Sequence, residues 1–170
     1  MLTPIVNLDI LKPYLMKEVA NVKLITKNFG EIEIDEKKII HFPEGILGFE
    51  GEKEFVIINN EDEESPFGWL QSIGNPELAF VIINPFFVYP NYDIVVPEAA
   101  QKKLEIQDKE DLSIYSIVVV PKDIEKMTAN LLGPIIINAK KLIGKQVILD
   151  DDRYSTKHYI FQQNLDDRSV

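Results

Sequence analysis

The chain has 170 residues, a formal net charge of −10, 45% hydrophobic and 27% charged residues, and no cysteine. This length fits one domain, and the composition excludes the disordered and collagen-like classes. Without cysteine there is no disulfide, no thiolate nucleophile and no Cys-ligated metal, which suits a reducing compartment. The acidic field repels phosphate backbones and attracts basic partners, so direct nucleic-acid binding is disfavoured. No stretch reaches the roughly 20 apolar residues of a membrane span and no signal peptide pattern is present, so we expect a cytoplasmic protein.

Short runs rich in isoleucine and valine alternate with glycine and proline turns, which is typical of an all-β protein. Residues 1–21 form an N-terminal arm without a clear period, and residues 163–170 form a polar tail, so we expect the folded domain to span residues 22–162. Strands are predicted first at residues 22–26, 30–34 and 38–42. In the second of these, isoleucines alternate with acidic residues, which indicates one buried and one solvated face.

The later elements follow the same rhythm. Strands are predicted at residues 55–59, 66–72, 78–84, 92–96, 112–120, 135–138, 146–149 and 157–161. A short helix is predicted after Pro97, which suits a first helical turn, and a helical turn is predicted at residues 123–127. About ten short strands at this spacing predict one compact domain, a mainly antiparallel β-barrel-like fold or sandwich with one or two short helices.

Groups that could carry catalysis are few. His41 and His158 could each act as a general base. Neither belongs to a recognised catalytic motif, and a histidine at a strand end or surface is more often structural. Gly45, Gly48 and Gly51 lie between strands, where they serve turns and not a nucleotide-binding loop. We therefore expect no enzyme, no cofactor and no metal.

Two acidic runs lie in predicted loops. They are Glu61, Asp62, Glu63 and Glu64, and Asp150, Asp151 and Asp152. Neighbouring side chains of an extended segment point in opposite directions, and the spacing and glycine of an EF-hand loop are absent, so a metal site is not favoured. The plain interpretation is a pair of solvated turns, and the functional one is electrostatic steering of a basic partner.

Aromatic residues gather near predicted turns, at Phe67, Trp69, Phe86, Phe87, Tyr89 and Tyr92. Along the strand at residues 66–72, alternation places Phe67, Trp69 and Gln71 on one face and Leu70 and Ser72 on the other. If the first face is exposed it is a candidate interface, because aromatic residues dominate binding hot spots. Core packing is the default alternative.

Five ordered motifs resemble the flagellar assembly factor FliW family. They are TKNFGEIEID at residues 26–35, IIHFPEGILGFE at 39–50, PFGWLQS at 66–72, NLLGPIIIN at 130–138 and KQVIL at 145–149. Each motif is weak alone, but the ordered set spans roughly residues 24–160 and is specific.

The resemblance implies a non-enzymatic cytoplasmic protein with a compact β-barrel-like fold. FliW proteins bind newly made flagellin and, in alternation, the RNA-binding translational regulator CsrA. FliW that is released when flagellin is exported sequesters CsrA and so relieves repression of flagellin translation. The acidic charge agrees with this, because a regulator that grips RNA is basic. The expected partners are CsrA and flagellin, and we expect the protein itself to be a monomer.

We expect the partner contacts where family-like motif and candidate surface aromatics coincide. The candidates are Phe67, Trp69, Leu70, Gln71, Ser72, Asn130 and Leu131, with the two acidic runs as weaker candidates for steering. A second hypothesis from a different class is a small-molecule-binding or hydrolytic β-barrel with an aromatic-lined pocket near residues 86–92. It requires a substantial pocket that contains His41 or His158.

Overall fold

The computed structural model describes residues 20–60, 62 and 64–161. Its strands are β1 Asn21–Thr26, β2 Gly30–Asp35, β3 Ile40–His41, β4 Glu54–Asn59, β5 Phe67–Ser72, β6 Ala79–Ile83, β7 Leu112–Val119, β8 Thr128–Ala129, β9 Ile135–Asn138, β10 Ile143–Gln146 and β11 His158–Tyr159. Its helices are α2 Pro85–Val88 and α3 Glu98–Lys103, with 3-10 turns η1 Glu36–Lys38, η2 Lys109–Asp111 and η3 Ile124–Lys126. The predicted arm lies outside the described residues except for Ala20 and Asn21, and the predicted tail lies outside them entirely.

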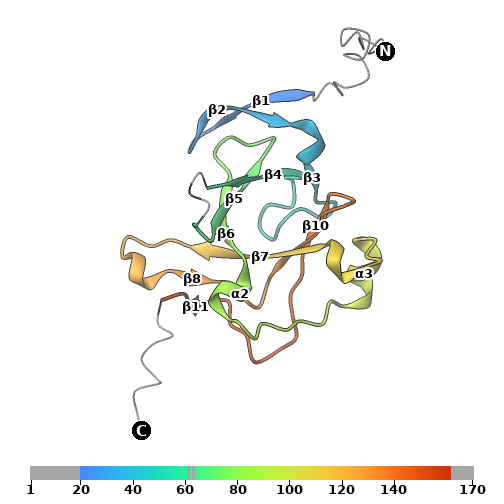
Figure 1. Cartoon of the computed structure of the whole chain (residues 1–170), viewed down its shortest axis with the longest axis vertical. Helices are drawn as coiled ribbons and strands as arrows, with labels where there is room; N and C mark the ends of the chain where they lie inside the picture. Colours follow the sequence, from blue (N-terminus) through green and yellow to red (C-terminus); the bar gives the residue numbers. More distant parts are fainter. Residues whose placement is uncertain (1–19, 61, 63, 162–170) are drawn as a thin grey trace, which may run out of the picture.

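Seven strands close into a barrel in the order β7–β6–β5–β4–β3–β10–β9, and β9 pairs back onto β7 (Figure 1). All neighbours in this ring are antiparallel except β3 and β10, which are parallel. Closure removes exposed edges from the ring. Beyond the end of β7, strands β8 and β11 extend the sheet outward. The prediction of a mainly antiparallel, barrel-like single domain with one or two short helices is confirmed.

Two apolar clusters occupy the two faces of the barrel wall. The inner cluster contains Phe55, Leu70 and Ile82, which belong to β4, β5 and β6. The outer cluster lies beneath α2 and α3 and contains Val88, Leu104 and Tyr154. Strand β9 contributes to both: Ile135 and Ile137 belong to the inner cluster and Ile136 to the outer one. Successive side chains of a strand alternate between faces, so its unbroken isoleucine run is buried on both sides.

The β1–β2 hairpin lies against the outside of the barrel. Leu24 and Ile34 are buried on its inner face together with Val56 of β4. The alternation of isoleucine and acid along β2 therefore separates a buried from a solvated face, as predicted. At the tip of the hairpin, the Phe29 ring meets the Trp69 ring edge to face, with centroids 5.4 Å apart.

The structure corrects several predicted strands. The strand predicted at residues 92–96 pairs with no other strand among the described residues. The strand predicted at residues 146–149 lies earlier in the chain, as β10 at Ile143–Gln146, where it pairs with β9 and β3 and Gly144 lies opposite Ile137. A Cβ at Gly144 would lie 2.4 Å from the Phe42 ring, so glycine lets that ring fill the inner cluster. Strand β8, helix α2 and the turns η1 and η2 were not predicted, and the helical turn predicted at residues 123–127 is the 3-10 turn η3.

No helix among the described residues is long and apolar enough to cross a membrane.

Candidate partner-binding surface

The second half of β5, Leu70 to Ser72, is buried, and two of its side chains form hydrogen bonds within the protein. Leu70, Gln71 and Ser72 are fully buried. The Gln71 Nε2 donates to the backbone carbonyls of Ser72, Asn75 and Leu78, and the Ser72 hydroxyl donates to a Glu52 carboxylate oxygen at 2.7 Å. These contacts hold the β5–β6 turn. Burial gives these three residues a structural role and leaves no surface through which they touch a partner, contrary to the expectation that they form contacts.

The first half of β5 is partly open. Phe67 and Trp69 are half-buried, and alternation places them on the outer face of the barrel wall, with Leu70 on the inner face. Phe67 packs against the outer cluster, and Trp69 is partly covered by Phe29. A role for Phe67 and Trp69 in partner contact remains a prediction.

The motif at residues 130–138 also divides into buried and accessible residues. Leu131 is fully buried, and its backbone carbonyl accepts a 2.6 Å hydrogen bond from the Tyr92 hydroxyl. Asn130 is half-buried, and its Oδ1 accepts from the Gly133 amide at 2.8 Å. Leu131 therefore belongs to the core, whereas contact by Asn130 remains a prediction. Asn138, which closes the motif, is buried and joins α3 to the β9–β10 turn.

A shallow pocket of about 330 Å³ joins the acidic loop and the start of β5 to the residue that precedes α2. Its lining includes Asp62 of the acidic loop, Phe67 of β5 and Asn84. The Asn84 side chain accepts a hydrogen bond from the Phe86 amide and so caps the single-turn helix α2. The pocket therefore places the acidic loop beside α2.

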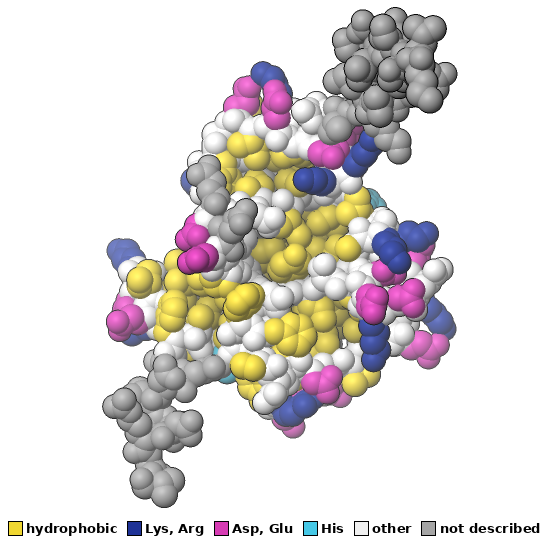
Figure 2. All heavy atoms as spheres, in the orientation of Figure 1, with side chains coloured by type: hydrophobic (Ala, Val, Ile, Leu, Met, Phe, Trp, Pro, Cys, Tyr) yellow, Lys and Arg dark blue, Asp and Glu magenta, His cyan; other side chains and the backbone are white. Residues whose placement is uncertain are grey.

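Helix α2 exposes two aromatic rings, Phe86 and Phe87, which in the sequence are only part of a group of aromatic residues near predicted turns. Pro85 and Val88 are buried, which turns Phe86 and Phe87 outward with 45% and 69% of their surface exposed. Figure 2 shows hydrophobic side chains gathered over the region where α2, β7 and β8 lie, with acidic side chains at its margin. Further exposed apolar residues of this end of the molecule are Val119, Val120, Ile124, Tyr159 and Phe161.

We use the name apolar tract for the exposed apolar residues of α2 and of the segment from the end of β7 to η3: Phe86, Phe87, Val119, Val120 and Ile124. A signal for part of it is present in the sequence, because Val119 and Val120 are successive and a strand cannot turn both toward the core. The exposure of the two phenylalanines has no such signal. It depends on which residues of a four-residue helix meet β7.

The two predicted acidic runs differ in their surroundings. Asp62 and Glu64 are exposed, while Glu61 and Glu63 lie outside the described residues. Asp150 and Asp152 are exposed too, but Asp151 is paired with Arg153 at 2.6 Å, and this guanidinium lowers the pKa of the Asp151 carboxyl. The charge of Asp151 is therefore balanced within the molecule, and steering remains a prediction for the exposed acids.

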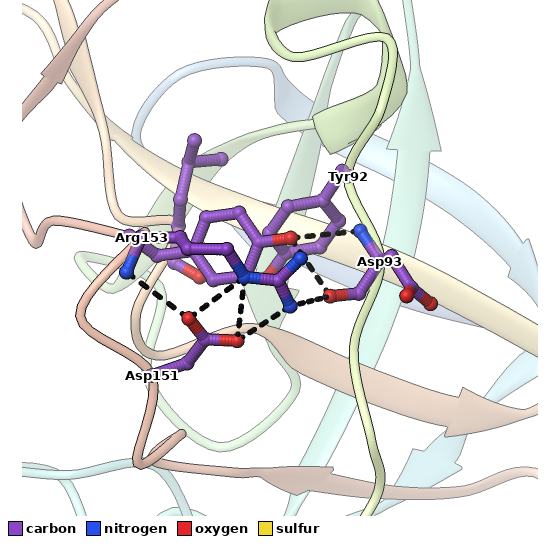
Figure 3. Close-up of polar contacts among 6 residues, drawn as sticks. Tyr92, Asp93, Asp151 and Arg153 are labelled. Atoms are coloured by element: carbon purple, nitrogen blue, oxygen red, sulfur yellow. Dashed lines mark hydrogen bonds and ion pairs between the residues drawn. The ribbon is translucent and has the colours of Figure 1, made fainter.

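Arg153 and Tyr154 join the segment after β10 to the backbone of Asp93 (Figure 3). The Arg153 guanidinium and the Tyr154 hydroxyl both donate to the Asp93 carbonyl, and the same hydroxyl accepts from the Asp93 amide. Behind them, burial raises the pKa of the Tyr92 phenol, with smaller contributions from Tyr154 and Asp151. We call Arg153 and Tyr154 the clamp.

The histidines do not form the pocket that a hydrolytic barrel would need. A groove of about 580 Å³ does lie beside Phe86 and Tyr92, but neither His41 nor His158 lines it. His41 is exposed in β3, whereas His158 in β11 lies against the Tyr89 ring, and burial lowers its pKa. Among the described residues, no three His, Asp or Glu side chains are grouped as a metal ion requires.

Comparison with known proteins gives a consistent result. The sequence profile of the family described as FliW protein matches residues 23–160. The flagellar assembly factor FliW of Alkaliphilus metalliredigens is 49% identical over 140 residues, which cover 82% of this chain and 86% of that protein. The protein of the same name from Thermoanaerobacter pseudethanolicus is 50% identical over 142 residues, covering 84% and 95%. A crystal structure of the flagellar assembly factor FliW superposes with a TM-score of 0.78 at 42% identity and covers 85% of this chain and all of that one.

Proposed function

This chain belongs to the FliW family of flagellar assembly factors, and from that premise we propose that it is a non-enzymatic partner switch in the cytoplasm. It binds flagellin and, in alternation, binds CsrA and antagonises it, so that flagellin translation resumes when flagellin is exported. The observation that supports the proposal within this molecule is that α2 exposes two phenylalanines and that its capping residue Asn84 shares a pocket with exposed Asp62.

The charge of the protein supports a basic partner. A net charge of −10 raises the local concentration of cationic surfaces and speeds their encounter. The apolar tract supplies what charge cannot, because buried aromatic side chains at the centre of an interface carry most of the affinity. An acidic rim around an apolar centre is therefore suited to a basic protein that has its own apolar patch.

The apolar tract can be tested with one substitution and one matched control. Phe87→Ala should weaken binding of CsrA or flagellin by about tenfold, because truncating an interface aromatic removes about 1–2 kcal/mol. Ile25→Ala removes a side chain that is similarly exposed, at 65% against 69%, but lies on the β1–β2 hairpin. It should leave both affinities unchanged. Titration calorimetry gives each affinity, and equal behaviour of the two variants toward both partners would contradict the assignment.

The acidic loop should act on the rate of association. Reversing the charges of Asp62 and Glu64 to lysine should slow association with CsrA at low salt and leave the rate at high salt nearly unchanged, because exposed charges are screened. Stopped-flow mixing at two ionic strengths measures this. Reversal of both exposed Glu33 and exposed Glu36, at the hairpin and the η1 turn that follows it, changes the net charge by the same amount and is the control. If it slows association as much as the loop variant does, the loop has no special position.

The alternative function, a small-molecule-binding or hydrolytic barrel, has less support. The groove beside Phe86 and Tyr92 offers volume and apolar walls, but neither histidine lines it, so it lacks the imidazole that this hypothesis requires.

A further inference from the structure

Residues 92–96 have the features of a β-strand that lacks a neighbour. Burial alternates strictly along the segment: Tyr92 is buried, Asp93 and Val95 are exposed, and Ile94 and Val96 are half-buried. That alternation is the signature of an extended chain with one face on the core. The isoleucine and valines also favour a strand. Even so, no strand pairs with it in the part of the chain that the structure describes.

The clamp covers one edge of this segment at Asp93, although the Val95 amide and carbonyl on that edge have no hydrogen-bond partner among the described residues. The Tyr154 hydroxyl bonds to both the amide and the carbonyl of Asp93 at 2.8 and 2.7 Å, as a neighbouring strand would, and Arg153 adds a third bond (Figure 3). In an extended chain, the amide and carbonyl of one residue point to the opposite edge from those of the next. The polar backbone groups of Ile94 and Val96 therefore point away from the clamp.

That second edge is mostly unpaired. On it, the Val96 carbonyl accepts from the Gln101 side chain at 2.7 Å. The Ile94 amide and carbonyl and the Val96 amide have no hydrogen-bond partner among the described residues. Main-chain groups in this state are a template for an added strand. Three groups within three residues suffice for a short ladder.

An apolar groove lies beside this edge. It has a volume of about 580 Å³, and Gln101, which reaches the Val96 carbonyl, is part of its lining. Its apolar lining includes Phe86, Ile94, Val96, Ile106, Leu112 and Ile114. A strand added along the edge would direct alternate side chains into this groove, next to those of Ile94 and Val96.

We propose that residues 93–96 are a docking edge for an extended peptide segment of a partner protein, which binds by β-strand addition and places branched aliphatic side chains in the groove. Its outward side chains include a basic residue near Asp93. The Asp93 side chain is exposed and its carboxylate points away from the Arg153 guanidinium, which acts on it only through a weak electrostatic interaction (Figure 3). The whole chain is also strongly acidic. The proposal does not rest on the proposed function, because it needs only a partner with such a segment.

The probe is a synthetic hexapeptide of alternating valine and lysine, acetylated and amidated at its ends. Two N-methylated forms of this peptide are compared, one methylated on all valine amides and the other on all lysine amides. In an extended peptide the amides of alternate residues point to opposite edges, so each form lacks the hydrogen-bond donors of one peptide edge. Titration into the full-length protein labelled with ¹⁵N and ¹³C, followed by NMR, should shift the amides of Ile94 and Val96 and the methyl groups of Leu112 and Ile114. One methylated form should lose affinity by about tenfold or more and the other by less than about twofold, because only one edge of the peptide faces the protein.

A pair of variants tests the same point from the protein side. Val96→Pro removes an amide of the open edge, whereas Val95→Pro removes one of the clamp edge. With melting temperatures confirming that both fold, only the first should weaken the peptide by about tenfold. Should either proline variant fail to fold, the methylated peptides alone decide.

Three results would overturn the proposal: no binding at millimolar peptide, equal affinity of the two methylated forms, or shifts confined to other strands. If sedimentation instead shows a dimer and the amides of Ile94 and Val96 become protected with rising protein concentration, the occupant is a second copy of this chain and the proposal of a partner peptide is wrong.

Discussion

Replacing Asn138 by alanine should strongly lower the free energy of unfolding of the protein. The side chain is buried and makes four hydrogen bonds. Its Nδ2 donates to the carbonyls of Leu104 and Glu105 at 2.9 and 3.2 Å, and its Oδ1 accepts from the amides of Lys140 and Lys141, both at 3.1 Å. One residue thus ties the end of α3 to the turn between β9 and β10.

The magnitude follows from these contacts. A typical hydrogen bond contributes about 1 kcal/mol net, and a buried carbonyl or amide that loses its partner costs a further desolvation penalty. Only the Leu104 bond is fully buried, so water can replace part of the other three. We therefore expect Asn138→Ala to lower the free energy of unfolding by about 2–4 kcal/mol.

Urea denaturation measures this change as a lower midpoint with an unchanged slope. The matched control is Gln107→Ala, which removes an exposed amide side chain and should change stability by less than about 0.5 kcal/mol. A loss below about 1 kcal/mol for Asn138→Ala would refute the reasoning, because it would mean that water satisfies the freed groups at no cost.

Three further predictions concern stability. Trp69→Ala should lower the free energy of unfolding by about 2 kcal/mol, because the ring is half-buried and the variant loses its edge-to-face contact with Phe29. This is less than for a fully buried tryptophan, and a loss above about 4 kcal/mol in urea denaturation would contradict it. Gly144→Ala should lower the free energy of unfolding by about 1–3 kcal/mol, because the added methyl group clashes with the fully buried Phe42 ring. Adding Phe42→Leu to this variant should recover part of the lost stability, whereas additive losses would contradict the clash. Burial lowers the pKa of His158 below its ordinary value of 6.5, so the folded state favours the neutral imidazole. The stability that this residue contributes is therefore complete above pH 6.5 and is lost as the pH falls through the lower pKa of the folded state. Denaturation at about pH 7 and pH 5.5 should show a smaller pH dependence for His158→Gln than for the parent, and equal dependence would contradict it.

The sequence predicted the fold well where pattern and contact coincide. Alternation along β2 identified its buried face, and Pro97 marked the start of α3. The strand at residues 92–96 was wrong for a physical reason, since propensity and alternation are local but pairing needs a neighbour. The position of β10 depends on its pairing with β9 and β3, which are tertiary contacts that local propensity does not contain.

The candidate site was less predictable. Family motifs drew attention to β5, yet Leu70, Gln71 and Ser72 are buried, because residues that hold a turn or a core can be as distinctive in sequence as residues that bind. Leu131 is another such case. The sequence did not indicate which of the aromatic residues near positions 86–92 are exposed, and so did not single out the two rings of α2. Whether a phenylalanine faces solvent is decided by how one helical turn sits on β7, and sequence periodicity over four residues cannot settle that.

We have proposed that this protein exchanges flagellin for CsrA. Titration calorimetry of the purified chain with CsrA, repeated after saturation with flagellin, measures this exchange. We expect saturable binding of CsrA alone and abolished or strongly weakened binding once flagellin is bound. Unchanged CsrA affinity in the presence of flagellin would contradict the switch, and no complex with CsrA by either heat or size would contradict the proposed function itself.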